Sequence, residues 1–262
     1  MLTITFANQK GGTTKTTTCV NLATALAMRG LKVLVIDMDS QATTSMILGP
    51  VSDEDTNTVY SVLINEIPLK NVIRKTRFEN LFIAPSNILL ASAEIELVPK
   101  VGREFMLKLS MSDLDNQFDF VLIDTAPSLG LLTINSLTAS DYIIIPISCD
   151  ILSFVGVKQL INTVNIVRKK LNPSLEILGV LLTRYDLRVR LSKEVERKTK
   201  EIFGDLLFPH YISENVKLRE APLQGKVIYE YAPNSRGARN YLEFANDFLK
   251  RVKKLTKNTK SN

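Results

Sequence analysis

Short apolar runs alternate with stretches of helical period along most of the chain. The continuous apolar runs have the length and composition of strands that are buried on both faces. They cover residues 2–7, 31–36, 81–84, 120–123, 142–147 and 175–182. Stretches of helical period lie between most of them, notably at residues 19–27, 154–169 and 192–203. Alternating strands and helices form right-handed crossovers, so the pattern predicts an α/β fold: a single doubly wound, mostly parallel sheet with helices on both faces.

Polar residues follow several of the predicted strands directly. They are Asp39, Asp124, Asp150 and Thr183. Open parallel sheets bind their ligands at the carboxyl ends of the strands. We therefore expect these residues to lie at the edge of the sheet that carries the functional site.

Basic residues are concentrated at the C-terminal end. The chain has 262 residues and a formal net charge of +6, and its last acid is Asp247. The basic residues after it are Lys250, Arg251, Lys253, Lys254, Lys257 and Lys260. We divide the chain into one domain over residues 1–249 and a basic tail over residues 250–262. The tail is either a frayed, solvating segment or an arm for nucleic acid or an anionic membrane.

Membrane-spanning and disulfide-rich classes do not fit this sequence. No run approaches the roughly 18 consecutive apolar residues of a membrane span, and the chain opens without a basic leader or cleavage site. Cys19 and Cys149 form no C-x-x-C pair, so they indicate neither a disulfide framework nor a zinc site. These features predict a cytoplasmic protein.

The segment from Lys10 to Thr18 joins the first predicted strand to the first helix and has part of a phosphate-loop pattern. The general pattern G-x-x-x-x-G-K-[ST] fails, because Gln9 and Thr14 occupy its glycine positions. Lys15 and Thr16 nevertheless open a helix directly after a strand, where backbone amides can face an anion. The alternative is a glycine turn whose threonines simply cap the helix.

A triphosphate site would give these residues distinct roles, since phosphoryl transfer depends on positioning and charge neutralisation. Lys15 would contact the β and γ phosphates, and the Thr16 hydroxyl would bind Mg²⁺. Asp39 would orient the attacking water and Asp124 would hold Mg²⁺, although a single Asp at a strand end is often only a helix cap. Lys10 is costly beside Lys15 unless phosphate compensates it, which favours dimerisation on ATP.

The chain resembles the ParA family of partition ATPases, in the deviant phosphate-loop (Walker A) class that also contains MinD. The resemblance runs almost end to end. Its motifs include residues 8–12, 15–18, 20–23, 37–42, 118–130, 181–186, 215–218, 220–226 and 233–238. It implies an ATP-sandwich dimer in which Lys10 reaches the partner's nucleotide. It also implies a weak ATPase that a ParB-like partner stimulates, ATP-dependent binding to nonspecific DNA, and localisation at the nucleoid.

The resemblance also implies which residues bind each ligand. Catalysis would use Lys10, Lys15 and Asp39. The nucleotide would contact Lys10, Gly11, Gly12, Thr13, Thr14, Lys15, Thr16 and Thr17, with Thr183, Ile212 and Ser213 near adenine and Asp150 near ribose. Thr16 and Asp124 would hold Mg²⁺. DNA phosphates would meet Arg184, Arg188, Arg190, Lys217 and Arg219, unless these residues, interspersed with acids, only form a solvated face.

The chain departs from the family pattern at positions 14, 40, 126 and 213–214. The family usually has Gly at 14, Pro at 40 and 126, and Pro-Arg at 213–214. A Thr at a position of positive φ is strained by about 1–3 kcal/mol, which would weaken nucleotide binding roughly 5- to 150-fold. Thr14 therefore leaves open a nucleotide-free or hydrolysis-dead scaffold with the same fold.

A MinD-like membrane ATPase is a further alternative. Its amphipathic terminal helix would contain Phe248, Leu249, Val252 and Leu255 with interleaved lysines. We prefer the ParA interpretation because residues 39–42 resemble the ParA loop, and we therefore expect no membrane partner.

Overall fold

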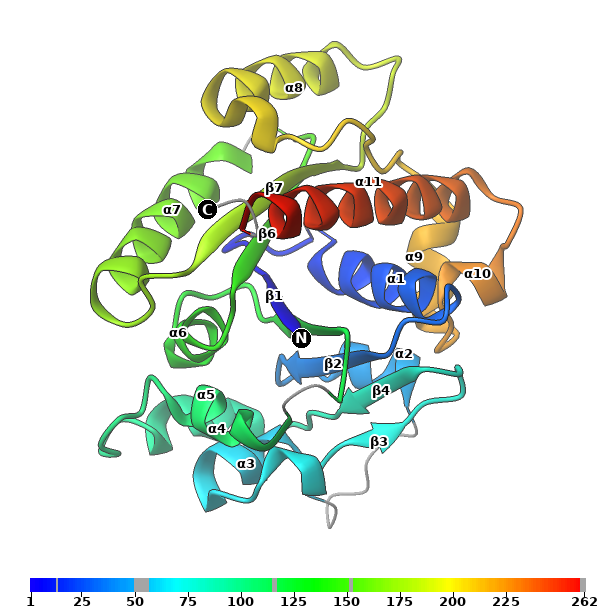
Figure 1. The fold of residues 1–262 in the computed structure, drawn as a ribbon. Coiled ribbons are helices and arrows are strands. Elements are labelled where there is room, and N and C mark those ends of the chain that lie inside the picture. The colour runs from blue at the N-terminus through cyan, green and yellow to red at the C-terminus, as the bar shows by residue number, and fades with distance from the viewer. Residues whose placement is uncertain (13, 50–56, 115–116, 151–152, 260–262) are drawn as a thin grey trace.

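The computed structural model describes residues 1–12, 14–49, 57–114, 117–150 and 153–259. Within them, seven strands form one sheet in the order β3-β4-β2-β5-β1-β6-β7 (Figure 1). The strands are β1 (Leu2–Phe6), β2 (Val33–Met38), β3 (Arg74–Lys75), β4 (Leu81–Ala84), β5 (Phe120–Thr125), β6 (Tyr142–Ser148) and β7 (Glu176–Thr183). All pairings are parallel except that of β3 with β4.

Helices cover both faces of this sheet, as the alternating pattern predicted. They are α1 (Lys15–Ala27), α2 (Thr43–Leu48), α3 (Val59–Asn65), α4 (Leu90–Glu96), α5 (Met106–Ser110), α6 (Leu131–Thr138), α7 (Ser153–Lys170), α8 (Arg190–Phe203), α9 (Val216–Leu223), α10 (Ile228–Tyr231) and α11 (Arg236–Thr259). Short 3-10 turns lie at Leu69–Asn71, Ser112–Leu114 and Gly204–Leu206. The fold is therefore the predicted doubly wound α/β class.

Successive residues of the central strands pack into different cores. On β5, Phe120 and Leu122 join a core that includes α1 and α11, which lie along the same face of the sheet (Figure 1). Val121 and Ile123 point the other way, into a core with α3, α4 and α5. This double burial is why β5 is an unbroken apolar run in the sequence.

Helix α11 extends beyond the boundary that we placed after residue 249. Phe248 is fully buried, Val252 is 8% exposed, and Leu249 and Leu255 pack against the same core. The Arg251 guanidinium donates to the carbonyls of Leu178, Asp205, Leu206 and Leu207 at 2.8–3.2 Å. The first part of the expected tail is thus a packed helix rather than a frayed segment.

Strand β1 lies where the connections of the sheet change direction. The chain leaves β1 for β2 on one side, while β6 pairs with β1 on the other. Ligands of open α/β sheets bind outside the carboxyl ends of the strands at such a point. The loop from β1 to α1 occupies this position.

Candidate functional site

Asn8 and Gly156 fix the start of the loop between β1 and α1. The buried Asn8 side chain donates to the Pro146 carbonyl at 2.7 Å and accepts from the Lys10 amide at 3.0 Å. Gly156 of α7 approaches closely: a Cβ there would lie 3.3 Å from Asn8 Oδ1 and 3.5 Å from the Lys10 nitrogen. Strand β6 and helix α7 therefore hold the loop backbone from two sides.

Thr14 has the left-handed backbone conformation expected where the family carries glycine. Its φ is 66° and its ψ is 27° at the N-cap of α1. Thr14 Oγ1 is buried beside the Tyr241 hydroxyl, without a hydrogen bond of normal geometry to a described residue. A left-handed L residue costs roughly 1–2 kcal/mol. Because the folded chain itself carries this conformation, we expect the cost to fall on folding stability, and the weaker nucleotide binding that the sequence suggested stays a prediction.

The first turn of α1 presents backbone amides and a buried lysine. Among the described residues, no side chain caps this helix end and no acid lies in its first turn. Lys15 is only 6% exposed, and its Nζ lies 3.4 Å from the Lys10 carbonyl. Burial lowers the pKa of Lys15, while the charges of Asp124 and Asp39 oppose that shift. A helix N-terminus with a poorly solvated cation suits a multiply charged anion.

Asp124 at the end of β5 has one occupied and one free carboxylate oxygen. Its Oδ2 accepts from the hydroxyls of Thr16 and Thr44, both at 2.7 Å. Its Oδ1 is buried and has no hydrogen-bond partner among the described residues. Burial raises the pKa of Asp124 to about 6, against the opposing effect of the two hydroxyls and Lys15. A free carboxylate oxygen beside a threonine hydroxyl fits the oxygen ligands that Mg²⁺ takes.

Two acids at the end of β2 have different environments. Asp37 is fully buried and accepts from the Ser45 amide at 2.9 Å, the Ser45 hydroxyl at 2.6 Å and the Asp39 amide at 3.1 Å. Burial and the charge of Asp124 raise the pKa of Asp37 to about 7. Asp39 is partly exposed and accepts from the Gln41 amide at 3.0 Å. Asp39 is therefore available to solvent at this edge, whereas Asp37 organises the turn into α2.

Asp37, Thr44 and Ser45 were not among the predicted site residues. Their hydrogen bonds join β2 to the neighbouring helix α2, and α2 to β5, which lies about 80 residues further along the chain. Only the spacing of Asp37 and Asp39 could have pointed to them, since residues two apart on a strand face the same side.

Lys10 forms an ion pair with Asp150 of the same chain, and Asp150 Oδ2 also accepts from the Ser148 hydroxyl at 2.6 Å. We expected that only phosphate would compensate the charge of Lys10. The structure corrects this point, because a carboxylate at the end of β6 already does so. The ion pair by itself therefore gives no reason for dimerisation.

A cavity of about 290 Å³ adjoins the loop. The loop contributes Gly12, Thr14 and Thr17, and the remaining walls are Arg184, Ile212, Ser213, Glu214, Asn215, Leu218, Arg219 and Pro222. Ile212 and Ser213 thus line a cavity together with loop residues, and their contact with adenine stays a prediction. Of the described residues, Thr183 and Asp150 do not line this cavity, so their contacts with a nucleotide stay predictions. Thr13 lies outside the described residues.

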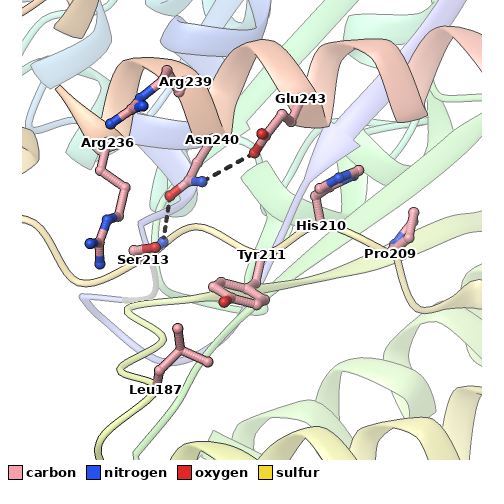
Figure 2. A pocket seen from close by; sticks show the side chains of 9 residues that line it. All are labelled: Leu187, Pro209, His210, Tyr211, Ser213, Arg236, Arg239, Asn240 and Glu243. Carbon is pink, nitrogen blue, oxygen red and sulfur yellow. Dashed lines mark hydrogen bonds between the residues drawn. The ribbon is translucent and has the colours of Figure 1, made fainter. Parts of the chain in front are cut away.

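Ser213 separates this cavity from a larger neighbour of about 440 Å³. Figure 2 shows how α11 holds the wall between them: Asn240 accepts from the Ser213 amide at 3.1 Å and donates to Glu243 at 3.2 Å. The 212–214 segment is fixed on its other side by β7, because the Ile212 amide donates to the Leu182 carbonyl at 2.9 Å. The wall is therefore positioned by backbone pairing rather than by side chains alone.

Comparison with known proteins decides the family. A family model described as an AAA domain matches residues 1–177. The sporulation initiation inhibitor protein Soj of Bacillus subtilis is 45% identical over 244 residues, 93% of this chain and 96% of Soj. The chromosome partitioning protein ParA of Caulobacter vibrioides is 39% identical over 250 residues, 95% of this chain and 94% of that protein. The chain belongs to the ParA family of partition ATPases.

Solved structures show the same fold as this ParA-family chain. A protein of Mycobacterium smegmatis described as cobyrinic acid a,c-diamide synthase, solved with ADP and magnesium, has a TM-score of 0.84 and 35% sequence identity. The match covers 97% of this chain and 96% of that one. The same protein was also solved with an ATP analogue and magnesium, with a TM-score of 0.83.

The residues predicted to contact DNA lie in the loop after β7, at the start of α8 and in α9. Four of the five form ion pairs within the chain: Arg184 with Glu214, Arg188 with Asp186, Lys217 with Glu220, and Arg219 with Glu214. Arg190 is exposed and forms no ion pair with a described residue. The structure thus brings these cations onto neighbouring segments, but most of them already have an acidic neighbour.

The apolar residues of α11 are unavailable as a membrane anchor in this fold. Phe248 packs edge-on against Phe120 of β5, with ring centroids 5.2 Å apart. Across the described ranges, none of the helices combines the length and the apolar character that crossing a bilayer requires.

Proposed function

We propose that this ParA-family protein is an ATP- and Mg²⁺-dependent switch in chromosome or plasmid partition. The observation that carries the proposal is the unpartnered Oδ1 of Asp124, buried beside Thr16 at the uncapped start of α1. Buried carboxylate oxygens normally have partners. A hydrated cation on a bound triphosphate would supply one here, and nucleotide with magnesium is present in the M. smegmatis structures.

Each residue of the site then has a specific role in nucleotide binding or hydrolysis. Lys15 and the α1 amides bind the phosphates, and Thr16 and Asp124 hold Mg²⁺, which neutralises phosphate charge when bound. Asp39 orients the attacking water from its partly exposed position. The adjacent 290 Å³ cavity accepts the base between the Ile212 side and the loop. Hydrolysis is slow until a ParB-like partner accelerates it.

Dimerisation and DNA binding complete the proposed switch. Lys10 would exchange Asp150 for the phosphates of a second protomer's nucleotide, which gives an ATP-sandwich homodimer. Arg184, Arg188, Arg190, Lys217 and Arg219 would then contact DNA phosphates without reading sequence. This activity would place the protein in the cytoplasm, at the nucleoid.

Calorimetric titration with ATP and Mg²⁺ tests the nucleotide site. We expect wild type to bind, Lys15→Ala to lose binding, and Asp124→Asn to lose the Mg²⁺ dependence of binding. Asp113→Asn is the matched control, because Asp113 is exposed and paired with Lys70. Absence of wild-type binding at millimolar ATP would refute the switch and favour the scaffold. Binding without hydrolysis, even with DNA and the partner present, would leave a switch without an enzyme.

The membrane alternative is less well supported. Its amphipathic face would consist of Phe248, Leu249, Val252 and Leu255, which pack into the α1–α11 core. Exposing that face would require α11 to leave the sheet. Sedimentation with anionic liposomes, comparing full-length protein with a version truncated after Asp247, checks this alternative; tail-dependent lipid binding would restore it.

A further inference from the structure

Glu214 lies between two cations of the proposed DNA surface. Its carboxylate accepts from Arg184 Nε at 2.9 Å and lies 3.6 Å from a terminal guanidinium nitrogen of Arg219. Arg184 belongs to the loop after β7 and Arg219 to α9, so one carboxylate joins two separate segments.

The backbone holds Glu214 in this place. Its amide donates to the Tyr185 carbonyl at 2.9 Å, and the Tyr185 amide donates to the Ile212 carbonyl at 3.0 Å. Tyr185 and Ser213 form a parallel bridge. The backbone of Glu214 is therefore anchored beside the end of β7, between the loop that carries Arg184 and the helix that carries Arg219.

The other acids near this surface each form an ion pair with one of the five cations. Asp186 pairs with Arg188 two residues away, and Glu220 pairs with Lys217 one helical turn away. In each of these pairs the acid and the cation belong to the same segment, so the pair does not link two segments. Of the described acids, Glu214 is the one paired with two of the five predicted DNA contacts.

We propose that Glu214 is a built-in counter-charge that limits the affinity of this surface for DNA. The inference rests on the proposed DNA binding and deepens it. A DNA phosphate that approaches Arg184 or Arg219 competes with the Glu214 carboxylate for the guanidinium, and the negative charge of that carboxylate repels the phosphate. Exposed ion pairs are weak, so displacement is feasible and the surface is attenuated rather than blocked.

The pairing also sets how salt affects binding. Each phosphate neutralised by the protein adds about 0.9 to the magnitude of the slope of log affinity against log salt. The single negative charge of Glu214 is shared by Arg184 and Arg219, so it offsets about one cation in that count. This chain should therefore show a shallower salt dependence than a variant in which both arginines are free.

Fluorescence anisotropy with a labelled DNA duplex of arbitrary sequence tests the proposal. The full-length protein is measured with and without ATP and Mg²⁺, between about 50 and 200 mM salt. Glu214→Gln keeps the shape and removes the charge, and we expect DNA affinity to rise about 2- to 30-fold at the lowest salt. The slope should steepen by about 0.9. Glu214→Arg should raise the affinity further.

Glu176→Gln is the matched control. It removes the same charge from an exposed residue at the opposite end of β7, and its DNA affinity should stay close to that of wild type. Thermal melts check that every variant folds. In a second background, Arg184→Gln with Arg219→Gln, the Glu214→Gln change should have no effect, because the cations that it frees are gone.

The outcomes separate the inference from the proposed function. If wild type binds DNA and Glu214→Gln matches Glu176→Gln, the counter-charge is refuted while DNA binding stands. If the gain persists in the double-arginine background, Glu214 acts through general charge and the inference is also refuted. If neither wild type nor Glu214→Gln binds DNA, although both bind ATP, DNA binding and the counter-charge are both refuted.

Discussion

Asp37 and Asp124 lie directly opposite each other on the neighbouring strands β2 and β5, and both side chains are fully buried. Two carboxylates in such a position cannot both ionise cheaply. Asp37 is satisfied by Ser45 and the Asp39 amide, whereas Asp124 keeps a free oxygen toward Thr16 and the loop. Because their partners differ, Asp37 has a structural role, whereas Asp124 is available to bind a cation.

This pair predicts that the protein loses stability as pH rises. The pKa values of Asp37 and Asp124 are raised to about 7 and about 6, from an ordinary value of 3.8. Between those limits the folded chain binds more protons than the unfolded chain, so the free energy of unfolding falls with increasing pH. We expect a loss on the order of 2–4 kcal/mol between about pH 5 and pH 8.

Thermal melts across that range measure the effect. Asp37→Asn should flatten the dependence, because the group with the larger shift no longer titrates. Asp113→Asn, on the exposed surface, should leave the dependence unchanged. A stability that rises from pH 5 to 8 in wild type would contradict the assignment of the raised pKa values.

Thr14→Gly should change stability more than nucleotide affinity. Glycine removes a left-handed strain of roughly 1–2 kcal/mol and adds about 0.5–1 kcal/mol of unfolded-state entropy. We therefore expect unfolding to require about 1 kcal/mol more, with less than a tenfold change in the ATP dissociation constant. Denaturant melts and calorimetry measure the two quantities. A much tighter ATP complex without a change in stability would assign the strain to binding instead.

Gly156→Ala should weaken ATP binding although it replaces glycine within a helix. An alanine in α7 normally stabilises by roughly 0.5–1 kcal/mol. Here its Cβ would lie 3.3 Å from Asn8 Oδ1, and Asn8 is held by Pro146, so the loop backbone must shift. We expect a several-fold higher ATP dissociation constant without loss of fold, and a larger effect for Gly156→Val. Lys158→Ala, exposed on the same helix, is the control. Equal ATP affinities for Gly156→Ala and wild type would show that the loop can accommodate a Cβ at position 156 without losing affinity.

Arg251→Ala should destabilise the fold by about 2–4 kcal/mol. Its guanidinium donates to one carbonyl within β7 and three in the segment after α8, and it lies 4.1 Å from the Phe208 ring centroid. Lys250→Ala removes a neighbouring exposed charge and should have little effect on stability. Urea denaturation compares the two variants. Similarly small changes in the free energy of unfolding of both variants would show that Arg251 does not stabilise the fold and behaves as part of the solvated tail that composition suggests.

The apolar runs were sufficient to predict six strands and the class of the sheet. A strand buried on both faces is apolar along most of its length, so β2, β5 and β6 are visible without any tertiary information. The two-residue strand β3 has no such signal, because Arg74 and Lys75 pair with β4 at the edge of the sheet. Composition also misjudged the start of the C-terminal tail, since it counts charges and does not register that Val252 and Leu255 face the core.

The sequence by itself determined the family, the fold class, the strand-to-helix loop with Lys15 and Thr16, and the acids at the strand ends. These features are local in the chain or repeat at fixed spacing. Only the tertiary structure decided that Thr44 shares Asp124 with Thr16, that Lys10 is neutralised by Asp150, and that Glu214 restrains two arginines. Each of these contacts joins residues about 30 or more positions apart or sets one carboxylate between two segments. Electrostatic and hydrogen-bond partners over such separations are fixed by strand order and register, which no local pattern encodes.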